Sequence, residues 1–299
     1  MSAHHHHHHH RTGDARRMRI VLGINLLLLA AGVVGGVVFD SLALLADAGH
    51  VLADVGAIGL ALFAAWLAAR PPSPQRTFGF RRTEILAALA NGLLLVVVSV
   101  LVFVEAVARL SNPPQVHGAG VLIVGALGLA GNAVAAWVLM KGDRSNLNLE
   151  GVLRHSAADA LGSLGVIVAG LVVITTGWDQ ADPLVSIAIG VLILLGSWRL
   201  LREPFNVLME SAPEGIDVQE LGQAMCGVPG VREVHDLHVW TVTSGFPALA
   251  AHIRSDPNES PEEVRERLEA VLHERFGLDH TTLQVVPEPL LQLEDRRRR

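Results

Sequence analysis

The sequence predicts an α-helical membrane protein with six transmembrane helices and a small C-terminal α+β domain. Two observations predict this fold class. Six apolar segments, each close to the ~20 residues that cross the core of a bilayer, fill the chain up to residue 203. Beyond that residue the sequence becomes charged and contains prolines, as a soluble domain does. Only 17% of the 299 residues are charged, against about 25% in an average soluble domain, so most of the chain is expected to lie in lipid.

Short polar interruptions separate the apolar segments, which are expected to form a transmembrane domain over residues 18–203. The segment before it, residues 1–17, is basic and rich in histidine. No cleavage pattern of a secretory signal precedes the first apolar segment, whose length fits an uncleaved helix. The six expected helices cover residues 18–38, 42–68, 83–110, 116–140, 150–177 and 183–203.

The basic residues indicate how these helices are oriented. Arginine is frequent in the N-terminal segment and between the second and third helices, and Lys141 and Arg144 lie between the fourth and fifth. The first and fifth loops contain neither Lys nor Arg. Because cytoplasmic loops carry the excess of basic residues, we expect both termini in the cytoplasm. The preference for arginine over lysine is typical of a GC-rich bacterial genome. We expect a multi-pass protein of the cell (inner) membrane.

The residues after 203 have the order of elements of a small two-layer α+β domain. We expect a cytoplasmic domain over residues 204–290, followed by a basic tail over residues 291–299. A domain of this kind on a membrane protein is expected to act in regulation or dimerisation. Its elements, in the order α-β-β-α-β, are expected at residues 217–227, 231–242, 248–254, 261–276 and 281–286.

Two His-x-x-x-Asp pairs lie inside the apolar segments, His50 with Asp54 and His155 with Asp159. Residues four apart share one face of a helix, so each pair presents an imidazole and a carboxylate to one point. Ionisable side chains at membrane depth are costly and usually functional. A single such residue could serve helix packing, but two matched pairs supply the four ligands that zinc prefers. The sequence therefore predicts a divalent-metal site between the second and fifth helices.

The charges of these four side chains indicate how the site is used. Two carboxylates and two neutral imidazoles neutralise one divalent ion, which is the least costly state in a medium of low dielectric constant. When the metal leaves, two carboxylates remain close together and favour the uptake of protons. Histidine also titrates near neutral pH. The pattern therefore predicts the exchange of a metal ion for protons.

Asp47 lies three residues before His50, on the same helical face. Metal-bound histidines usually donate their second ring N–H to a nearby acceptor, so Asp47 is a candidate for orienting His50. A solvated charge near the start of the helix is the other interpretation.

Five stretches of the sequence resemble motifs of the cation diffusion facilitator family. The resemblance extends over the chain from about Met18 to Pro287. The resemblance implies a homodimer of six-span protomers, each with a ferredoxin-like cytoplasmic domain. It also implies export of zinc or a related cation from the cytoplasm in exchange for protons. The stretches are SLALLADAGHVLAD at 41–54, TFGFRRTEILAAL at 77–89, NLEGVLRHSAADALGS at 148–163, DPLVS at 182–186 and HDLHVW at 235–240.

By the same resemblance, His50, Asp54, His155 and Asp159 fall on the positions of the family's transport site. Members with His and Asp on both helices usually prefer zinc, and imidazole also suits zinc better than manganese. We therefore expect Zn²⁺ as the transported ion and as a regulatory ligand, with cadmium, cobalt, nickel and manganese as further candidates. Protons, membrane lipid and a second copy of the chain are the other expected partners. The modest net charge of −6 gives no indication of nucleic acid.

Three histidines of the C-terminal domain, His235, His252 and His280, resemble the cytoplasmic metal site of the family. His252 and His280 fall on the more polar phase of their expected strands. The family often places a further ligand where this chain has Val286, so solvated surface histidines are an equal alternative. His238 falls on the opposite phase from His235 and is expected to be structural.

The run from His4 to His10 has two interpretations. Unbroken histidine runs are typical of affinity tags, which take no part in a fold. Histidine-rich cytoplasmic ends that gather metal also occur in the family.

Two other classes of function could use the same residues. In an intramembrane metallohydrolase they would activate water, which needs an open coordination position and a general base. The sequence has no nucleophile motif such as G-x-S-x-G, so an enzyme is not expected. A non-transporting metal sensor has no need of an ionisable site at membrane depth. The absence of a Walker-type phosphate loop excludes a primary pump, and the single cysteine, Cys226, excludes a Cys-rich zinc module.

Overall fold

The computed structural model describes residues 8–140 and 149–287 of the chain. The histidine run at 4–10 and the basic tail at 291–299 lie outside the described side chains. Three groups of helical residues have a described backbone without described side chains: residues 8–18, Leu139 and residues 149–157.

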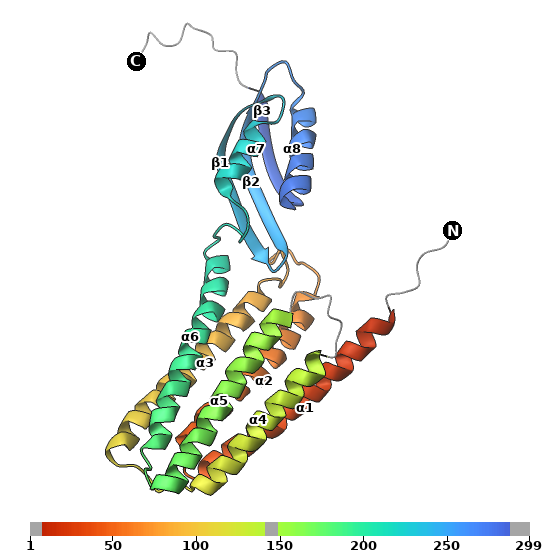
Figure 1. The fold of residues 1–299 in the computed structure, drawn as a ribbon. Coiled ribbons are helices and arrows are strands. Elements are labelled where there is room, and N and C mark those ends of the chain that lie inside the picture. The colour runs from red at the N-terminus through yellow and green to blue at the C-terminus, as the bar shows by residue number, and fades with distance from the viewer. Residues whose placement is uncertain (1–7, 141–148, 288–299) are drawn as a thin grey trace. The chain divides into compact units, whose positions relative to one another are not determined.

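Six long helices make up most of the structure, and each contains a stretch long and apolar enough to cross a membrane. This confirms the fold class that the sequence predicts for this part of the chain. By internal packing the chain divides into two units, Met1–Phe63 with Ala87–Leu201 and Ala64–Leu86 with Arg202–Arg299. The helices are α1 (His8–Val38), α2 (Leu42–Ala68), α3 (Thr83–Ser111), α4 (Gly118–Met140), α5 (Leu149–Thr176) and α6 (Ala181–Leu208), as Figure 1 shows.

Large apolar side chains cover the outside of these helices. Leu27, Leu195 and Trp198 are exposed by 73%, 70% and 69%, respectively, and many other leucines and valines are more than half exposed. A soluble domain rarely carries so much contiguous apolar surface, whereas the hydrocarbon core of a bilayer accommodates it. An α-helix also satisfies its own backbone N–H and C=O groups, as that environment requires.

Helices α4 and α5 are in backbone-to-backbone contact. A Cβ atom placed on Gly118 of α4 would lie 2.9 Å from the carbonyl oxygen of Gly170 of α5. One placed on Gly170 would lie 2.9 Å from the backbone nitrogen of Leu122. Both distances are shorter than a carbon atom can approach, so only glycine fits at these two positions. Small residues allow membrane helices to pack this closely.

A carboxylate from α6 caps the first turn of α2. Asp182 Oδ2 accepts a hydrogen bond from the backbone N–H of Leu42 (2.7 Å), and Asp182 Oδ1 accepts one from the Ser41 hydroxyl (2.5 Å). The Ser41 oxygen in turn accepts the backbone N–H of Leu44 (3.2 Å). The first N–H groups of any helix lack partners within the helix and need such acceptors. Ser41 and Asp182 are both fully buried, so these contacts are shielded from water.

Further hydrogen bonds join the short loops at this end of the helices. Arg109, near the end of α3, donates a hydrogen bond from Nη1 to the carbonyl oxygen of Asp40, in the loop between α1 and α2 (2.9 Å). The backbone N–H of Val116, just before α4, donates to Oδ1 of Asp179, between α5 and α6 (3.2 Å). The loop before α2 is therefore held by α3, and the segments before α4 and α6 are held to each other.

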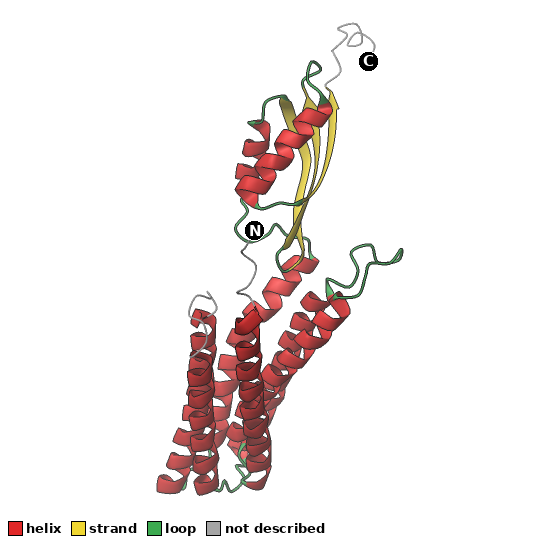
Figure 2. Ribbon diagram, turned by 90° about the vertical axis from the view of Figure 1, so that its right-hand side faces the viewer, coloured by secondary structure: helices red, strands yellow, loops and turns green. Residues whose placement is uncertain are grey.

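The C-terminal part of the chain is a three-stranded sheet with two helices on one face (Figure 2). Strands β1 and β2 pair antiparallel, and β2 and β3 pair parallel. The order α-β-β-α-β is the order that the sequence predicts. The elements are α7 (Val218–Cys226), β1 (Val231–Thr243), β2 (Phe246–Ser255), α8 (Pro261–Phe276) and β3 (His280–Pro287).

The hairpin between β1 and β2 is longer than expected because its turn is very short. Gly245 has a positive φ of 69°, which suits a two-residue turn, and Thr243 pairs directly with Phe246 across it. Apolar residues of both helices pack on the sheet and form the core of this domain. Its fully buried members include Leu221, Met225, Leu249, Ile253, Leu268, Leu272 and Leu278.

Replacing Asp182 with Asn should destabilise the helical bundle. The amide removes the charge and turns one acceptor into a donor that faces the donors of Ser41 and Leu42. We expect a loss of about 1–3 kcal/mol, measured as a lower melting temperature of the detergent-solubilised protein. Ser186→Ala is the matched control, because the Ser186 hydroxyl only bonds the carbonyl oxygen of Asp182 within its own helix. Equal melting temperatures for Asp182→Asn and the wild type would show that the cap contributes little.

Candidate metal centre

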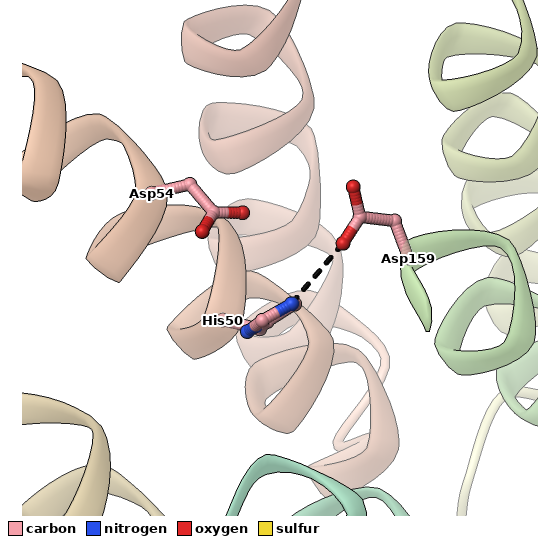
Figure 3. A group of neighbouring side chains, drawn as sticks. All are labelled: His50, Asp54 and Asp159. Atoms are coloured by element: carbon pink, nitrogen blue, oxygen red, sulfur yellow. Dashed lines mark hydrogen bonds and ion pairs between the residues drawn. The ribbon is translucent and has the colours of Figure 1, made fainter. Parts of the chain in front are cut away.

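Three of the predicted metal-site residues lie together between α2 and α5 (Figure 3). One ligand atom from each of His50, Asp54 and Asp159 lies within 4.8 Å of the other two. His50 Nε2 lies 3.1 Å from Asp159 Oδ1, which is a hydrogen-bonding distance. Among the described residues, this is the one group of three or more histidine, cysteine and acidic side chains with such spacing.

Helix geometry brings these side chains to one place. His50 and Asp54 are one turn apart on α2, so they share a helical face. Figure 3 shows Asp159 reaching from α5 toward both of them. The side chains of His50 and Asp159 are exposed by 21% and 15%, so they are mostly enclosed and still accessible to an ion.

The fourth predicted ligand, His155, lies outside the described side chains. Its backbone belongs to α5, one helical turn before Asp159, which places both residues on the same helical face. The structure therefore brings together three of the four predicted residues, and the role of His155 stays a prediction.

The chemistry of the three described side chains suits a divalent cation. Zinc binds imidazole nitrogen and carboxylate oxygen at about 2.0–2.2 Å in a tetrahedron, whose ligand atoms are then about 3.3–3.6 Å apart. The 4.8 Å spread of the three ligand atoms needs only a small contraction to reach that geometry. Two carboxylates in a mostly enclosed site also supply the negative charge that a cation requires.

The predicted role of Asp47 in orienting His50 stays a prediction. Among the described residues the hydrogen-bond partner of Asp47 is Ser163 of α5, whose hydroxyl donates to Asp47 Oδ2 at 3.4 Å. The reason lies on α5, where Gly162 has no side chain and leaves room for the Asp47 carboxylate. The sequence alone gives no sign of this partner, because the pairing depends on how α2 and α5 pack.

Two of the three predicted cytoplasmic histidines are neighbours in the sheet. His235 of β1 pairs with His252 of β2, and their ring centroids are 5.4 Å apart. Asp236 Oδ2 lies 4.0 Å from His252 Nε2, and Asp236 Oδ1 lies 3.0 Å from His238 Nε2. A cluster of His235, Asp236, His238 and His252, hereafter the sheet cluster, therefore lies on one exposed part of the domain.

The sequence alone does not reveal Asp236 and His238 as members of this cluster. Strand alternation places Asp236 on the opposite face from His235, but the pairing of β1 with β2 shifts register between His235 and His238. Asp236 also has a positive φ of 53°, so the strand departs from regular alternation at this point. An irregularity of this kind leaves little signal in a sequence.

His280 lies away from the sheet cluster, and its predicted part in a cytoplasmic metal site stays a prediction. It pairs with Ala248, four residues along β2 from His252, which is about 13 Å at the rise of a strand. Its ring instead contacts the rings of Phe78 and Phe246, at centroid distances of 5.7 and 5.2 Å. The physical reason is the register of the parallel β2–β3 pair, which starts at Ala248.

Comparison with known protein families gives a match to each part of the chain. Residues 18–209 match the cation efflux transmembrane domain. Residues 213–288 match the cytoplasmic domain of cation efflux proteins.

Similar proteins align with nearly the whole chain. The metal cation efflux system protein CzcD of Cupriavidus metallidurans is 39% identical over 283 residues, which are 94% of this chain and 90% of that protein. The cadmium, cobalt and zinc/H⁺-K⁺ antiporter of Bacillus subtilis is 39% identical over 85% of this chain and 83% of its own length. The zinc transporter ZitB of Escherichia coli is 38% identical over 96% of this chain and 92% of its own length.

Among solved structures, the metal-bound C-terminal domain of the CzcD transporter from Cupriavidus metallidurans is 36% identical. The match covers 24% of this chain and 99% of that domain, with a TM-score of 0.23.

The two family matches and the relatives that align with nearly the whole chain establish its family. The chain belongs to the cation diffusion facilitator family of cation efflux proteins, and it is a multi-pass membrane transporter, not an enzyme.

Proposed function

We propose that this protein exports Zn²⁺ from the cytoplasm in exchange for protons, by alternating access to a site made of His50, Asp54, His155 and Asp159. The observation that carries the proposal is the convergence of His50, Asp54 and Asp159 between two membrane-spanning helices. Ionisable groups at membrane depth commonly mark the path of a transported ion.

Charge neutrality supports the exchange of metal for protons. A bound divalent cation balances the charges of Asp54 and Asp159, so the loaded site is neutral with two neutral imidazoles. An empty site that returned across the membrane with two uncompensated carboxylates would carry a large desolvation cost. Protons on these side chains remove that cost. The 3.1 Å distance between His50 Nε2 and Asp159 Oδ1 supports this exchange, because it is a hydrogen-bonding distance across which a proton can pass.

The donor atoms and the relatives favour zinc as the cargo. Imidazole nitrogen and carboxylate oxygen form a borderline ligand set that suits zinc. The name of ZitB specifies zinc, while that of the Bacillus subtilis antiporter specifies cadmium, cobalt and zinc together with H⁺ and K⁺. Cadmium and cobalt are therefore the strongest competing cargoes.

The expected topology completes the proposal. The arginines of the N-terminus and of the loop between α2 and α3 support a topology with both termini in the cytoplasm, in a protein of the inner membrane. Residues 18–203 act as the transport domain, and residues 204–290 act as a cytoplasmic domain that pairs with a second copy of the chain. The match of residues 213–288 to the cytoplasmic domain of cation efflux proteins supports this division.

We also propose a regulatory zinc site in the sheet cluster, with His235 and His252 as ligands. Their rings lie edge to face across paired strands, with centroids 5.4 Å apart, and Asp236 adds a carboxylate next to His252. Surface histidines without metal are the alternative. Zinc at this position would link β1 to β2 in the domain that pairs the two copies.

The decisive test of the main proposal is transport by purified protein in lipid vesicles. Zinc should enter inside-out vesicles when their lumen is more acidic than the outside, and the lumen should lose protons as zinc accumulates. A panel of zinc, cadmium, cobalt, nickel and manganese measures selectivity. A metal sensor that does not transport would bind zinc and move none.

Replacing Asp54 or Asp159 with Asn should abolish zinc transport while the protein stays folded. Each change removes one charged ligand from the site and leaves a bound zinc ion with uncompensated positive charge. Breaking a buried charge pair costs about 3–5 kcal/mol, which corresponds to more than a 100-fold weaker affinity. Glu105→Gln, at a half-exposed acidic residue of α3, is the control. Normal transport by either Asn variant would contradict the proposed site.

Replacing His50 with Asp should relax the selectivity for zinc. The change exchanges a borderline nitrogen ligand for a hard oxygen and adds negative charge. In competition assays in vesicles, cadmium or manganese transport should rise relative to zinc transport by about tenfold, equivalent to ~1.4 kcal/mol. An unchanged metal profile would mean that His50 does not bind the transported ion.

The regulatory site can be tested by counting bound zinc when the transport site is disabled. In the Asp54→Asn background, changing His235 and His252 to Ala should remove one zinc ion per protomer from equilibrium dialysis, whereas His280→Ala should remove none. The histidine run at residues 4–10 is common to all these variants and cancels in the comparison. An equal loss of bound zinc from both changes would support the three-histidine site. No loss of bound zinc from the double change would mean that these histidines are surface residues that bind no metal.

A further inference from the structure

A second polar cluster lies one helical turn from the metal centre. Asp47 of α2, Ser163 of α5 and Asn132 of α4 form a chain of hydrogen bonds. Asn132 Nδ2 donates to Ser163 Oγ at 3.4 Å, and the Ser163 hydroxyl donates to Asp47 Oδ2 at 3.4 Å. Ser163 and Asn132 are buried. Polar groups from three different helices therefore meet inside the apolar bundle.

Two glycines make room for the Asp47 carboxylate. A Cβ atom on Gly162 of α5 would lie 2.7 Å from Asp47 Oδ1. One on Gly128 of α4 would lie 3.1 Å from Ser163 Oγ and 3.9 Å from Asp47 Oδ2. With a side chain at either position, the carboxylate or the hydroxyl would have to move. The space around Asp47 is therefore built into the neighbouring helices.

Asp47 also borders a small enclosed cavity. The cavity measures about 20 Å³, and Asp47 and Asn132 line it together with Leu28, Gly32 and Val124. A cavity of roughly 10–15 Å³ or more can hold a water molecule if polar partners are present. Asp47 and Asn132 supply such partners, so the site has room for water beside the carboxylate.

The hydrogen bond to Asp47 is too weak to explain why a carboxylate lies at this depth. A distance of 3.4 Å is longer than the usual 2.5–3.0 Å of O–H···O hydrogen bonds. An ionised carboxylate has about four acceptor positions, and among the described residues only Ser163 occupies one of them. A carboxylate in a membrane helix with spare acceptor positions and adjacent water space is suited to receive a cation.

The order of residues along the helices places this cluster on one side of the metal centre. On α2 the sequence runs from the capped end at Ser41 through Asp47 and His50 to Asp54. Asp47 is thus about 4.5 Å along the helix axis from His50, toward the end where α2 begins. In the topology proposed above that end faces away from the cytoplasm, so a cation leaving the cell meets Asp47 after the metal centre.

We propose that Asp47, with Ser163 and Asn132, forms a transit site that receives the divalent cation, partly hydrated, as it leaves the metal centre for the outside. The inference rests on the proposed export of a divalent cation. The Asp47 carboxylate supplies the attraction, and the water space next to it lets the ion regain part of its hydration shell. When no ion is bound there, Ser163 holds the carboxylate in place, and Asn132 holds Ser163.

This role differs measurably from that of a residue that orients His50. An orienting residue supports a bound metal at equilibrium, and its loss usually weakens metal affinity by about 10- to 100-fold. A transit site acts during release, so its loss should slow turnover and leave the equilibrium affinity of the metal centre unchanged. Binding and turnover therefore separate the two roles.

The test uses Asp47→Asn in the full chain. Zinc affinity is measured in detergent by calorimetry. The Asp54→Asn variant, which keeps the histidine run, is titrated separately so that zinc binding outside the metal centre can be subtracted. Zinc transport is measured in vesicles. We expect an affinity within about twofold of wild type and a maximal rate at least about tenfold lower, which is ~1.4 kcal/mol on the barrier. Ser197→Ala, at a buried hydroxyl bonded within α6, is the control for general packing effects.

Two results would overturn the proposal. A 10- to 100-fold loss of affinity with an unchanged maximal rate would return Asp47 to the role of orienting His50. No change in either quantity would make the cluster a packing element only.

If Asp47→Asn does not fold, Gly162→Ala serves instead, because it crowds Asp47 Oδ1 and keeps the charge. It should lower the maximal rate and spare affinity, and an unaltered rate would again count against a transit site. A wild-type protein that moves no zinc would instead contradict the proposed function.

Discussion

The cap that Asp182 provides for α2 is the contact on which the metal centre depends. A helix that begins among other apolar helices cannot rely on water for its first N–H groups, so a buried acceptor must be supplied. Asp182 supplies it from α6, and Ser41 relays it to the next turn. Since α2 carries His50 and Asp54, the contact that fixes where α2 begins also fixes how far these ligands lie from the loops.

The helical bundle separates two uses of polar side chains. Those at the loop end, such as Asp182 and Arg109, make short hydrogen bonds to backbone groups and so hold helices in place. Those at the centre, His50 and Asp159 above all, lie opposite one another and are only partly enclosed. The first kind stabilises the fold, while the second kind retains enough access to exchange partners.

The sequence predicts regular features well and irregular ones poorly. Apolar length predicts the six helices, and the four-residue spacing places His50 and Asp54 on one face, because both depend on helix periodicity alone. The parallel register that carries His280 away from His252, and the shift in β1 that brings Asp236 beside His252, depend on strand pairing. Similarly, Asp47 of α2 contacts Ser163 of α5 because Gly162 of α5 has no side chain in the way. Such contacts arise between elements, and spacing within one element does not encode them.

The glycine contact between α4 and α5 has a mechanical consequence. With the backbones of Gly118 and Gly170 touching and no side chain between them, the two helices have little freedom to slide or tilt apart. Asp159 therefore belongs to the closely packed α4–α5 pair, whereas His50 and Asp54 belong to α2. An ion held by all three is a reversible cross-link between two parts of the bundle. Its arrival and departure should thus change the stiffness of the whole bundle.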